Sequence, residues 1–442
     1  MRQRLLIGLV IAVLFFGGIY LYASRPDVAK VDIGQMFGAR PNITAPRPQV
    51  IPTINVADAV GWKNGAKPMA AAGLAVEAFA SGFDHPRWLY RLPNGDVLVA
   101  ESNSPPREGR GIADWIMGHL MAKAGAGVAS ANRITLLRDA DGDGKAETRS
   151  TFLTGLNSPH GMVLVGDWLY VADTDALLRF PYKTGDTKIT AKPELVVKLP
   201  GGGNHWARNV IAAPDGKTLF VGVGSSTNIA ENGMDAEQNR ADILEVFPDA
   251  KTFRIYAAGL RNPNGMAIEP RTQRLWTVVN ERDMLGSDLA PDYLTDVELG
   301  DQFGWPWYYW GGYPDKRVQP DNQALQTYSK RPAYALGPHT ASLGLAFAND
   351  ARLGARFANG AFISQHGSWN RVPASGYKVI FVPFDANLGF PAKNAQPVDV
   401  LTGFLDAKGQ AQGRPVGVIT DKTGALLVAD DVGNTIWRVH AQ

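Results

Sequence analysis

Residues 414–430 read Arg-Pro-Val-Gly-Val-Ile-Thr-Asp-Lys-Thr-Gly-Ala-Leu-Leu-Val-Ala-Asp, a pattern that recurs along the chain. A polar cluster with proline precedes a short apolar run, a turn, and a second apolar run that ends in small or acidic residues. Short apolar runs bounded by Gly, Asn, Asp and Pro are typical of paired β-strands. The same unit recurs at His85–Glu101, Pro159–Asp173, Arg208–Gly222, Asn262–Val278 and Ser342–Phe347, the last with its partner run at 361–364.

Further apolar runs, such as Arg133–Arg138 and Asp242–Phe247, lie between the copies and extend each unit to four strands. Six copies of a four-stranded unit predict an all-β fold, a six-bladed β-propeller over residues 69–442. A β-sandwich or several small β domains would not require six matching copies. The only helix that the sequence predicts in this region lies near Gly111–Ala129.

The N-terminus predicts a membrane anchor. Arg2 and Arg4 precede 19 uncharged residues, Leu5 to Ala23, which at about 1.5 Å per residue just span a hydrocarbon core of roughly 30 Å. The basic end should stay cytoplasmic, which places the rest of the chain on the periplasmic side. Residues 1–24 are therefore expected to be an N-terminal transmembrane helix or, alternatively, a cleaved signal segment. Residues 25–68 are rich in proline and are expected to form a tether.

The composition excludes several kinds of chemistry. The chain of 442 residues has no cysteine, so it has no disulfide, thiolate metal site, Fe–S cluster or cysteine nucleophile. Lys and Arg number 44 against 42 Asp and Glu, and no long basic run is present, so nothing indicates a nucleic-acid partner.

Candidate site residues gather at one place in the repeat. Residues just before each inner strand of a propeller crowd one mouth of its central channel. These positions hold His85, Arg87, His160, His205, Arg208, Arg261, Asn262, His339 and Arg414, and His366 follows the fifth inner pair. Arginines bind carboxylates through paired hydrogen bonds and stack on flat rings, and histidine exchanges a proton near neutral pH. The cluster therefore suits a planar, multiply anionic ligand.

Two acidic stretches are candidates for a hard cation. Asp139, Asp141 and Asp143 alternate with small residues and are followed by Glu147, which matches the first half of a calcium loop. Ser150 stands where a helix–loop–helix site would place its bidentate Glu, so the alternatives are a structural calcium site and a plain polar hairpin. The second stretch is the insertion Asn280–Glu298, which supplies carboxylates and irregular backbone carbonyls at the channel mouth or forms a solvated loop.

Several motifs resemble those of the quinoprotein sugar dehydrogenases, the family of soluble glucose dehydrogenase and the L-sorbosone dehydrogenases. They are Gly259-Leu-Arg-Asn-Pro-Asn-Gly-Met-Ala267, Asn280-Glu-Arg-Asp283, Phe303-Gly-Trp-Pro306, Gln365-His-Gly-Ser-Trp-Asn-Arg371 and Gly413-Arg-Pro-Val-Gly-Val418. The last two look more like the sorbosone branch. The resemblance covers roughly residues 70 to 440 and implies a six-bladed propeller that carries pyrroloquinoline quinone (PQQ) and calcium over its channel.

The resemblance also implies individual roles. His205 looks like the catalytic base, and Arg261 and Asn262 look like the pair at the quinone carbonyls. His160 and Arg414 look like further cofactor contacts. The lysine that contacts the cofactor in the family has no clean match in this sequence, although Arg371 or Lys378 could serve in its place. Gln412 stands where the family has a second arginine. The main-chain carbonyls of Asp283 and Met284 look like the calcium ligands.

The sequence therefore predicts an oxidoreductase that oxidises a sugar or sugar-derived aldehyde and passes the electrons to an unidentified acceptor. His205 would take the proton while hydride passes to the quinone, and calcium and Arg261 would polarise the receiving carbonyl. One alternative is a calcium-dependent lactone hydrolase, which needs convergent carboxylates rather than arginines. The other is a non-catalytic propeller that binds a ligand, which fold alone does not exclude.

Overall fold

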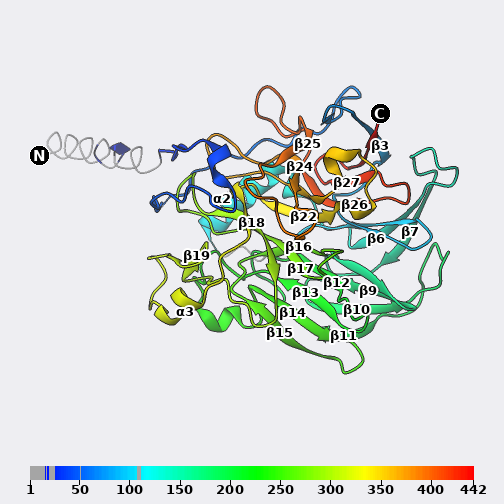
Figure 1. The fold of residues 1–442 in the computed structure, drawn as a ribbon, viewed down its shortest axis with the longest axis horizontal. Coiled ribbons are helices and arrows are strands. Elements are labelled where there is room, and N and C mark those ends of the chain that lie inside the picture. Colours follow the sequence, from blue (N-terminus) through cyan, green and yellow to red (C-terminus); the bar gives the residue numbers. More distant parts are fainter. Residues whose placement is uncertain (1–14, 16, 19–24, 50, 107–110) are drawn as a thin grey trace, which may run out of the picture.

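The computed structural model describes residues 15, 17, 18, 25–49, 51–106 and 111–442, and six antiparallel sheets arranged in a ring form its core (Figure 1). Blade 1 consists of β4 (Pro86–Arg91), β5 (Val97–Glu101), β6 (Arg133–Arg138) and β7 (Thr148–Thr154). Blade 2 consists of β8 (Met162–Val165), β9 (Trp168–Ala172), β10 (Ala176–Pro181) and β11 (Glu194–Lys198). Blade 3 consists of β12 (Arg208–Ala212), β13 (Leu219–Val223), β14 (Asp242–Phe247) and β15 (Thr252–Ala258).

The later blades take strands from the beginning of the chain. Blade 4 consists of β16 (Pro263–Ile268), β17 (Leu275–Val279), β18 (Pro291–Val297), β21 (Tyr334–Pro338) and β1 (Phe37–Gly38). Blade 5 consists of β22 (Ser342–Phe347), β23 (Gly360–Gln365), β24 (Lys378–Pro383), β25 (Val398–Thr402) and β2 (Met69–Ala70). Blade 6 consists of β26 (Pro415–Thr420), β27 (Leu426–Asp430), β28 (Thr435–Ala441) and β3 (Leu74–Ser81), so a strand from the start of the propeller closes the ring. The predicted six-bladed propeller is confirmed.

Glycines at one repeat position bring the inner strands close together. A Cβ on Gly344 of β22 would lie 2.3 Å from the Val416 carbonyl oxygen of β26, and one on Gly265 of β16 would lie 2.6 Å from the Leu343 oxygen. Gly417 meets the next inner strand in the same way. Any larger residue would push the neighbouring blade outward, which explains why glycine recurs in the repeat.

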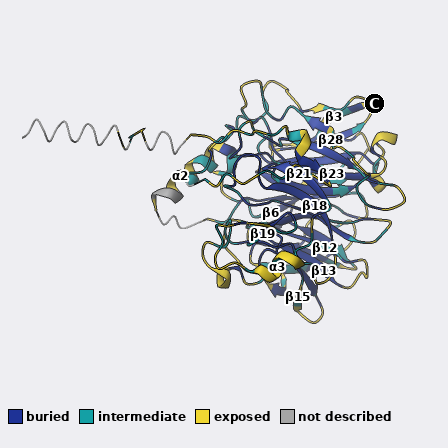
Figure 2. Ribbon diagram, turned by 60° about the vertical axis from the view of Figure 1, so that its left-hand side comes forward, coloured by how far each residue is buried: buried dark blue, intermediate teal, exposed yellow. Residues whose placement is uncertain are grey.

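Apolar side chains fill the space between adjacent blades. Each of the six hydrophobic clusters joins two neighbouring sheets. Phe220 of blade 3 lies in one cluster with Met266 of blade 4, and Trp276 of blade 4 lies in another with Leu345 of blade 5. Figure 2 shows the buried strands in the middle of the molecule and exposed residues in the peripheral loops. The blades therefore form one rigid support for the loops at the ends of the channel.

Helical segments are short and lie outside the sheets. The structure confirms the expected helix as α2 (Ile112–Met121), which continues into the π-helical turn η2 (Ala122–Ala126), and it adds a second helix, α3 (Gln323–Tyr328), that the sequence did not predict. Single turns are η1 (Ile33–Met36), η3 (Met234–Glu237), η4 (Ala348–Asp350) and η5 (Ala355–Phe357), and β19 (Tyr308–Tyr309) pairs with β20 (Tyr313–Pro314). The insertion at 280–298 is not a solvated loop, because its second half forms β18, which is buried along its whole length.

The N-terminal segment is bound to the propeller rather than free of it. We call residues 25–49 and 51–62 the N-terminal strap. Its Lys30 N–H donates to the Asp288 carboxylate, its Asn55 N–H donates to the Trp369 carbonyl, and its Trp62 indole donates to Asp430 at 2.7 Å. The segment has little regular structure, as a tether would, but these contacts hold it on blades 4, 5 and 6. The expected span at 5–23 lies almost wholly outside the described residues, and no helix within them is long and apolar enough to cross a bilayer.

Candidate active site

The inner strands form a closed ring in which each contacts the inner strands of the two adjacent blades. The predicted arginines and histidines stand at or just before the first residues of these strands: His85 and Arg87 at β4, His160 at β8, His205 and Arg208 at β12, Arg261 and Asn262 at β16, His339 at β22 and Arg414 at β26. Because all six inner strands start at the same end of the ring, these side chains surround one mouth of the channel.

A buried carboxylate joins three of these groups. Asp431, which directly follows β27, accepts from the Arg87 guanidinium and lies 2.8 Å from His366 Nε2 and 3.4 Å from His85 Nε2. Burial alone would raise the pKa of Asp431, but the charges and hydrogen bonds of His366, His85 and Arg87 lower it overall. Burial lowers the pKa of His366 to about 4. The carboxylate is therefore ionised, and it holds the Arg87 guanidinium of blade 1 and the imidazole of His366 of blade 5 together.

His160 is the most isolated polar group at the mouth. It is fully buried, and neither ring nitrogen has a hydrogen-bond partner among the residues that the structure describes. Its ring lies against Trp88, with centroids 4.7 Å apart, and meets the edge of Trp206. Burial lowers the pKa of His160 well below its usual value, so the ring is neutral. Buried polar atoms without partners are rare, and here they suit a ligand that supplies the missing hydrogen bonds.

His205 is held in one orientation by its neighbours. Its Nδ1 lies 2.8 Å from the carbonyl oxygen of Ser225 and 3.1 Å from the hydroxyl oxygen of the same residue. Since a carbonyl only accepts, Nδ1 carries the hydrogen, and Nε2 keeps a lone pair that can accept a proton. Burial, followed by the charge of Arg261, lowers the pKa of His205 to about 3. The imidazole is therefore neutral at ordinary pH and has the form of a base.

Arg261 is fixed by hydrogen bonds from three directions. It donates to the Glu281 carbonyl at 2.6 Å, to the Asp283 carboxylate at 2.9 Å and to the Asn228 side-chain oxygen at 3.0 Å. The other oxygen of Asp283 accepts from the Asn370 amide at 2.9 Å and lies 3.5 Å from His339. Burial alone would raise the pKa of Asp283, but Arg261 and His339 lower it overall.

Asn262 and His205 lie side by side across Gly224. A Cβ on Gly224 would lie 2.3 Å from the Asn262 side-chain oxygen and 2.6 Å from His205 Cβ. Only a glycine allows both side chains to occupy these places. The structure thus brings together the predicted base and the predicted arginine–asparagine pair.

The carbonyls expected to bind calcium have other partners. The Asp283 and Met284 oxygens accept from the guanidinium of Arg317 at 3.0 and 3.2 Å, and the Met284 oxygen also accepts from the Gln49 N–H at 3.1 Å. As they stand, these two carbonyls do not fit a metal ion.

The outer acidic loop lies at the other end of the propeller. Asp139, Asp141, Asp143 and Glu147 connect β6 to β7, and their ligand atoms lie within 4.8 Å of one another. Arg133, the first residue of β6, pairs with Glu101 at the channel mouth, so the loop after Arg138 is at the opposite end. The four carboxylates fit a structural calcium site, which stays a prediction, and they are remote from His205.

The comparisons with known proteins identify the family. The TrAA12-like family profile matches residues 68–298 and 289–442, which together make up most of the chain. The chain belongs to the TrAA12-like family. The match confirms the resemblance to quinoprotein sugar dehydrogenases, because several proteins similar to this chain are named as PQQ-dependent or sugar dehydrogenases.

The PQQ-dependent pyranose dehydrogenase of Coprinopsis cinerea is 24% identical over 433 residues, covering 84% of this chain but only 54% of that enzyme. The solved PQQ domain of the Coprinopsis cinerea enzyme has a TM-score of 0.69 at 19% identity and covers 87% of this chain and 100% of the domain. The soluble aldose sugar dehydrogenase of Escherichia coli has a TM-score of 0.56 at 18% identity, and the match covers 84% of this chain and 100% of that one. These likenesses show that the fold is shared.

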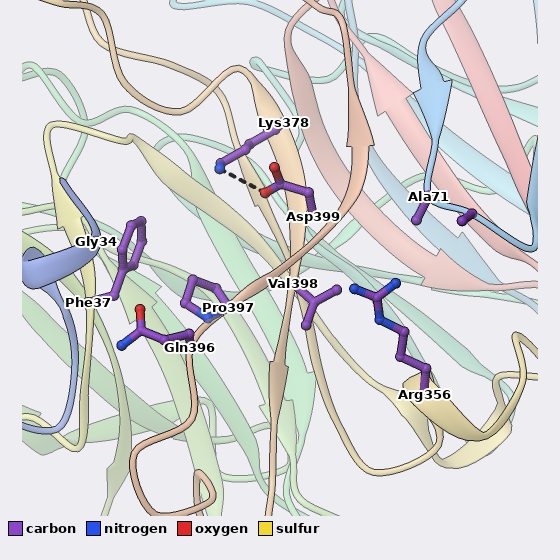
Figure 3. A pocket seen from close by; sticks show the side chains of 10 residues that line it. Gly34, Phe37, Ala71, Arg356, Lys378, Gln396, Pro397, Val398 and Asp399 are labelled. Atoms are coloured by element: carbon purple, nitrogen blue, oxygen red, sulfur yellow. Dashed lines mark hydrogen bonds and ion pairs between the residues drawn. The ribbon is translucent and has the colours of Figure 1, made fainter. Parts of the chain in front are cut away.

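Two other predicted cofactor residues of this TrAA12-like protein are engaged elsewhere. Arg371 is 2% exposed and donates to the carbonyls of Ser287 and Pro373, so its guanidinium ties two loops together. Lys378 pairs with Asp399 at 2.8 Å beside a surface groove of about 500 Å³ (Figure 3). Contacts between described residues do not bring either side chain to the cluster of His205 and Arg261. Their cofactor roles stay predictions that these contacts do not support.

Sequence reasoning missed several residues that shape the mouth. Asp431, Asn228, Ser225 and Asn370 hold the predicted cations and base, yet none was singled out. A signal existed for Asp431, because the second strand of the sixth repeat ends in two consecutive aspartates. Asn228 lies in the irregular loop after β13 and carries no pattern that marks it.

Proposed function

We propose that this chain is a quinoprotein oxidoreductase that oxidises a sugar or sugar-derived aldehyde with PQQ as its cofactor. The observation that carries the proposal is a mouth lined by Arg87, Arg261 and Arg414 together with a neutral His205 whose Nδ1 is bound to a carbonyl. Relatives named as PQQ-dependent sugar dehydrogenases support the same conclusion.

The residues at the mouth fit a planar quinone with several carboxylates. Besides both nitrogens of His160, the Nε atoms of Arg87 and Arg414 are buried without a partner among the described residues. Guanidinium groups with free donors bind carboxylates, and the rings of Trp88 and Trp206 pack against His160 beside them. We infer that His160, Arg87, Arg261, Asn262 and Arg414 hold the cofactor, which supplies an electrophilic carbonyl that takes two electrons from the substrate carbon.

His205 moves the proton in this proposal. Its Nε2 removes the proton from the substrate hydroxyl, and the Ser225 carbonyl stabilises the imidazolium that forms through the Nδ1 hydrogen. Arg261 is held in place by Asp283 and Asn228, so its charge is fixed before the reaction begins. A preorganised charge of this kind stabilises negative charge without reorganisation during the reaction.

The finer assignments are also proposals. Motifs at 365–371 and 413–418 support a substrate of the sorbosone type, an aldehyde that reacts as its hydrate. The basic and apolar N-terminus supports attachment to the membrane, with the propeller in the periplasm and an electron acceptor there.

One experiment tests the function. Purified full-length protein is mixed with PQQ and calcium and then assayed for dye reduction with a panel of aldoses, ketoses and sugar-derived aldehydes. Turnover that requires PQQ supports the proposal. Lactone hydrolysis that continues without PQQ would instead identify a hydrolase, and sugar binding without any turnover would identify a binding protein.

A further inference from the structure

Arg317 occupies the place where the sequence predicted a calcium ion. It lies after β20, and its side chain reaches the loop between β17 and β18 of blade 4. Its Nη1 donates to the carbonyl oxygens of Asp283 and Met284 at 3.0 and 3.2 Å. Both oxygens thus point at one nitrogen, as they would point at a cation.

The lone pairs of the two carbonyls are fully used. The Asp283 oxygen also accepts from the Asn228 side-chain amide at 3.2 Å, and the Met284 oxygen also accepts from the Gln49 N–H at 3.1 Å. A carbonyl oxygen has two lone pairs, so neither has one left for a metal. Calcium needs six to eight oxygen ligands at roughly 2.3–2.6 Å, and a guanidinium in their midst repels it.

Arg317 is held for this task by a buried carboxylate. Asp315 is 3% exposed and accepts from Arg317 Nε at 2.8 Å and from Nη2 at 2.6 Å, which is a bidentate pair. The same carboxylate lies 3.4 Å from Arg282, which is itself completely buried. This geometry fixes the guanidinium plane and leaves Nη1 to the two carbonyls.

Arg317 is linked to the active site through Asp283. The backbone of Asp283 is bound by Arg317, and its side chain binds Arg261, Asn370 and His339. A shift of the Asp283 backbone would move the carboxylate that orients Arg261.

We propose that Arg317 replaces a metal ion at the Asp283–Met284 carbonyl pair, where its guanidinium supplies the positive charge and fixes the backbone so that quinone binds without calcium at the mouth. The inference rests on the proposed function. It makes Arg317 a positioning residue, because it touches the loop and not the reacting atoms.

The test uses the full chain carrying Asp141→Asn and Asp143→Asn, which removes two of the four carboxylates of the remote outer loop and so weakens it as a source of bound calcium. Metal-free protein is titrated with PQQ in chelator and in excess calcium, with tryptophan quenching as the readout, and retained calcium is measured by elemental analysis. We expect equal affinity in both conditions and no retained calcium. A calcium ion retained at the mouth, or binding of PQQ that requires calcium, would overturn the inference.

Variants then test the role of the side chain. In chelator, Arg317→Ala should weaken PQQ binding about 10- to 100-fold, the range for losing charged hydrogen bonds. Arg317→Lys should recover part of the loss because it keeps the charge, and a thermal melt reports whether each variant is folded. The matched control is Arg352→Ala, an exposed arginine after β22 at the other end of the propeller. A folded Arg317→Ala protein with wild-type affinity in chelator would overturn the inference.

Failure of the proposed function has a different signature. If the wild-type mouth binds no PQQ in either condition, the proposed function is wrong. The calcium measurement on the same samples still decides whether Arg317 excludes an ion.

Discussion

The hydrogen bond between His205 Nδ1 and the Ser225 carbonyl decides, at the scale of single residues, which nitrogen can act as a base. A carbonyl is neutral, so it orients the imidazole without raising its pKa as strongly as a carboxylate would. Burial and Arg261 dominate, and they hold the pKa of His205 at about 3 in the absence of substrate. The base is therefore deprotonated before substrate arrives.

Replacing His205 tests its role directly. His205→Ala should lower kcat by about 10²- to 10⁴-fold, the usual loss for a general base, while PQQ affinity stays within a few-fold of wild type. Steady-state dye reduction and quinone titration measure the two effects. His440→Ala, a change on the last strand, serves as the control and should have normal turnover. Near wild-type turnover in the His205 variant would transfer the role to another group, with His160 the first candidate.

The lowered pKa of His205 predicts its behaviour on titration. A histidine whose pKa is lowered in the folded state stays neutral as the pH falls through 6.5, whereas an exposed one becomes charged there. We expect ¹⁵N-resolved NMR of the cofactor-free protein to show an unchanged, Nδ1-protonated His205 through this range. The ring should charge only on approach to pH about 3. The His205 signal is assigned as the one that disappears in the His205→Asn variant. A titration midpoint near 6.5 for that signal would contradict the structure.

Position in the repeat made some site residues predictable and left others hidden. His160, His205, Arg261 and Arg414 could be found because each stands at the start of an inner strand. Their partners, such as Asn228, lie in loops whose course is set by contacts distant in the chain. Arg317 is 34 residues beyond the Asp283 carbonyl that it binds, and no local pattern reveals such a pairing.

At the scale of elements, backbone N–H groups hold the carboxylates of the loop between β6 and β7 in place. Asp139 accepts from the Gly142 and Gly144 N–H groups, and Glu147 accepts from the Ala140 N–H. Like-charged carboxylates held this close repel one another, so a bound cation would stabilise the hairpin.

Calcium should therefore raise the thermal stability of the metal-free protein. The melting temperature is expected to rise with calcium concentration, because a ligand that binds only the folded state stabilises it. Asp141→Asn should abolish the rise, whereas Asp186→Asn, in an equivalent turn of blade 2, should retain it. Differential scanning fluorimetry measures both. A melting temperature that calcium leaves unchanged in the metal-free wild type would show that the loop is a plain hairpin.

The N-terminal strap is the element that the sequence described least well. It lacks periodicity and has many prolines, so only its composition could be interpreted. Several of its partners lie far away in sequence: the Lys30 N–H donates to Asp288, which is 258 residues away, and Arg47 pairs with Asp288 as well as with Asp27. Such contacts become visible only when the loops of blades 4 and 5 are in place.

At the scale of the whole molecule, six similar sheets become stable only as a closed ring. The propeller could be predicted because each unit is local in sequence, and its strands are short runs separated by turns. The ring closes in blade 6, where β3 from the start of the propeller pairs with β28 from its end. The paired residues run from Thr435 opposite Ser81 to Ala441 opposite Leu74. Each interface between blades buries an apolar cluster, so opening one interface exposes two sheet faces.

Removal of the last strand tests how strongly closure stabilises the fold. A chain that ends at Asn434 should lose cooperative unfolding, because β3 keeps an unpaired edge and Trp437 and Val439 leave the core. Removing only the exposed Gln442 should leave the melting curve unchanged. Circular dichroism and hydrogen exchange at β3 report the result. A truncated chain that melts like the full one would mean that the ring does not need this strand.

The closing pair of strands also affects how the protein is made. Ser81 and Thr435 are 354 residues apart, and ribosomes add about 5–20 residues per second, so β3 waits roughly 20 to 70 seconds for its partner. During that time its open edge can pair with any other extended segment nearby. Blades 1 to 5 can each assemble as they emerge, but the sixth cannot. Biogenesis of this protein is therefore helped by shielding one eight-residue strand until β28 has been made.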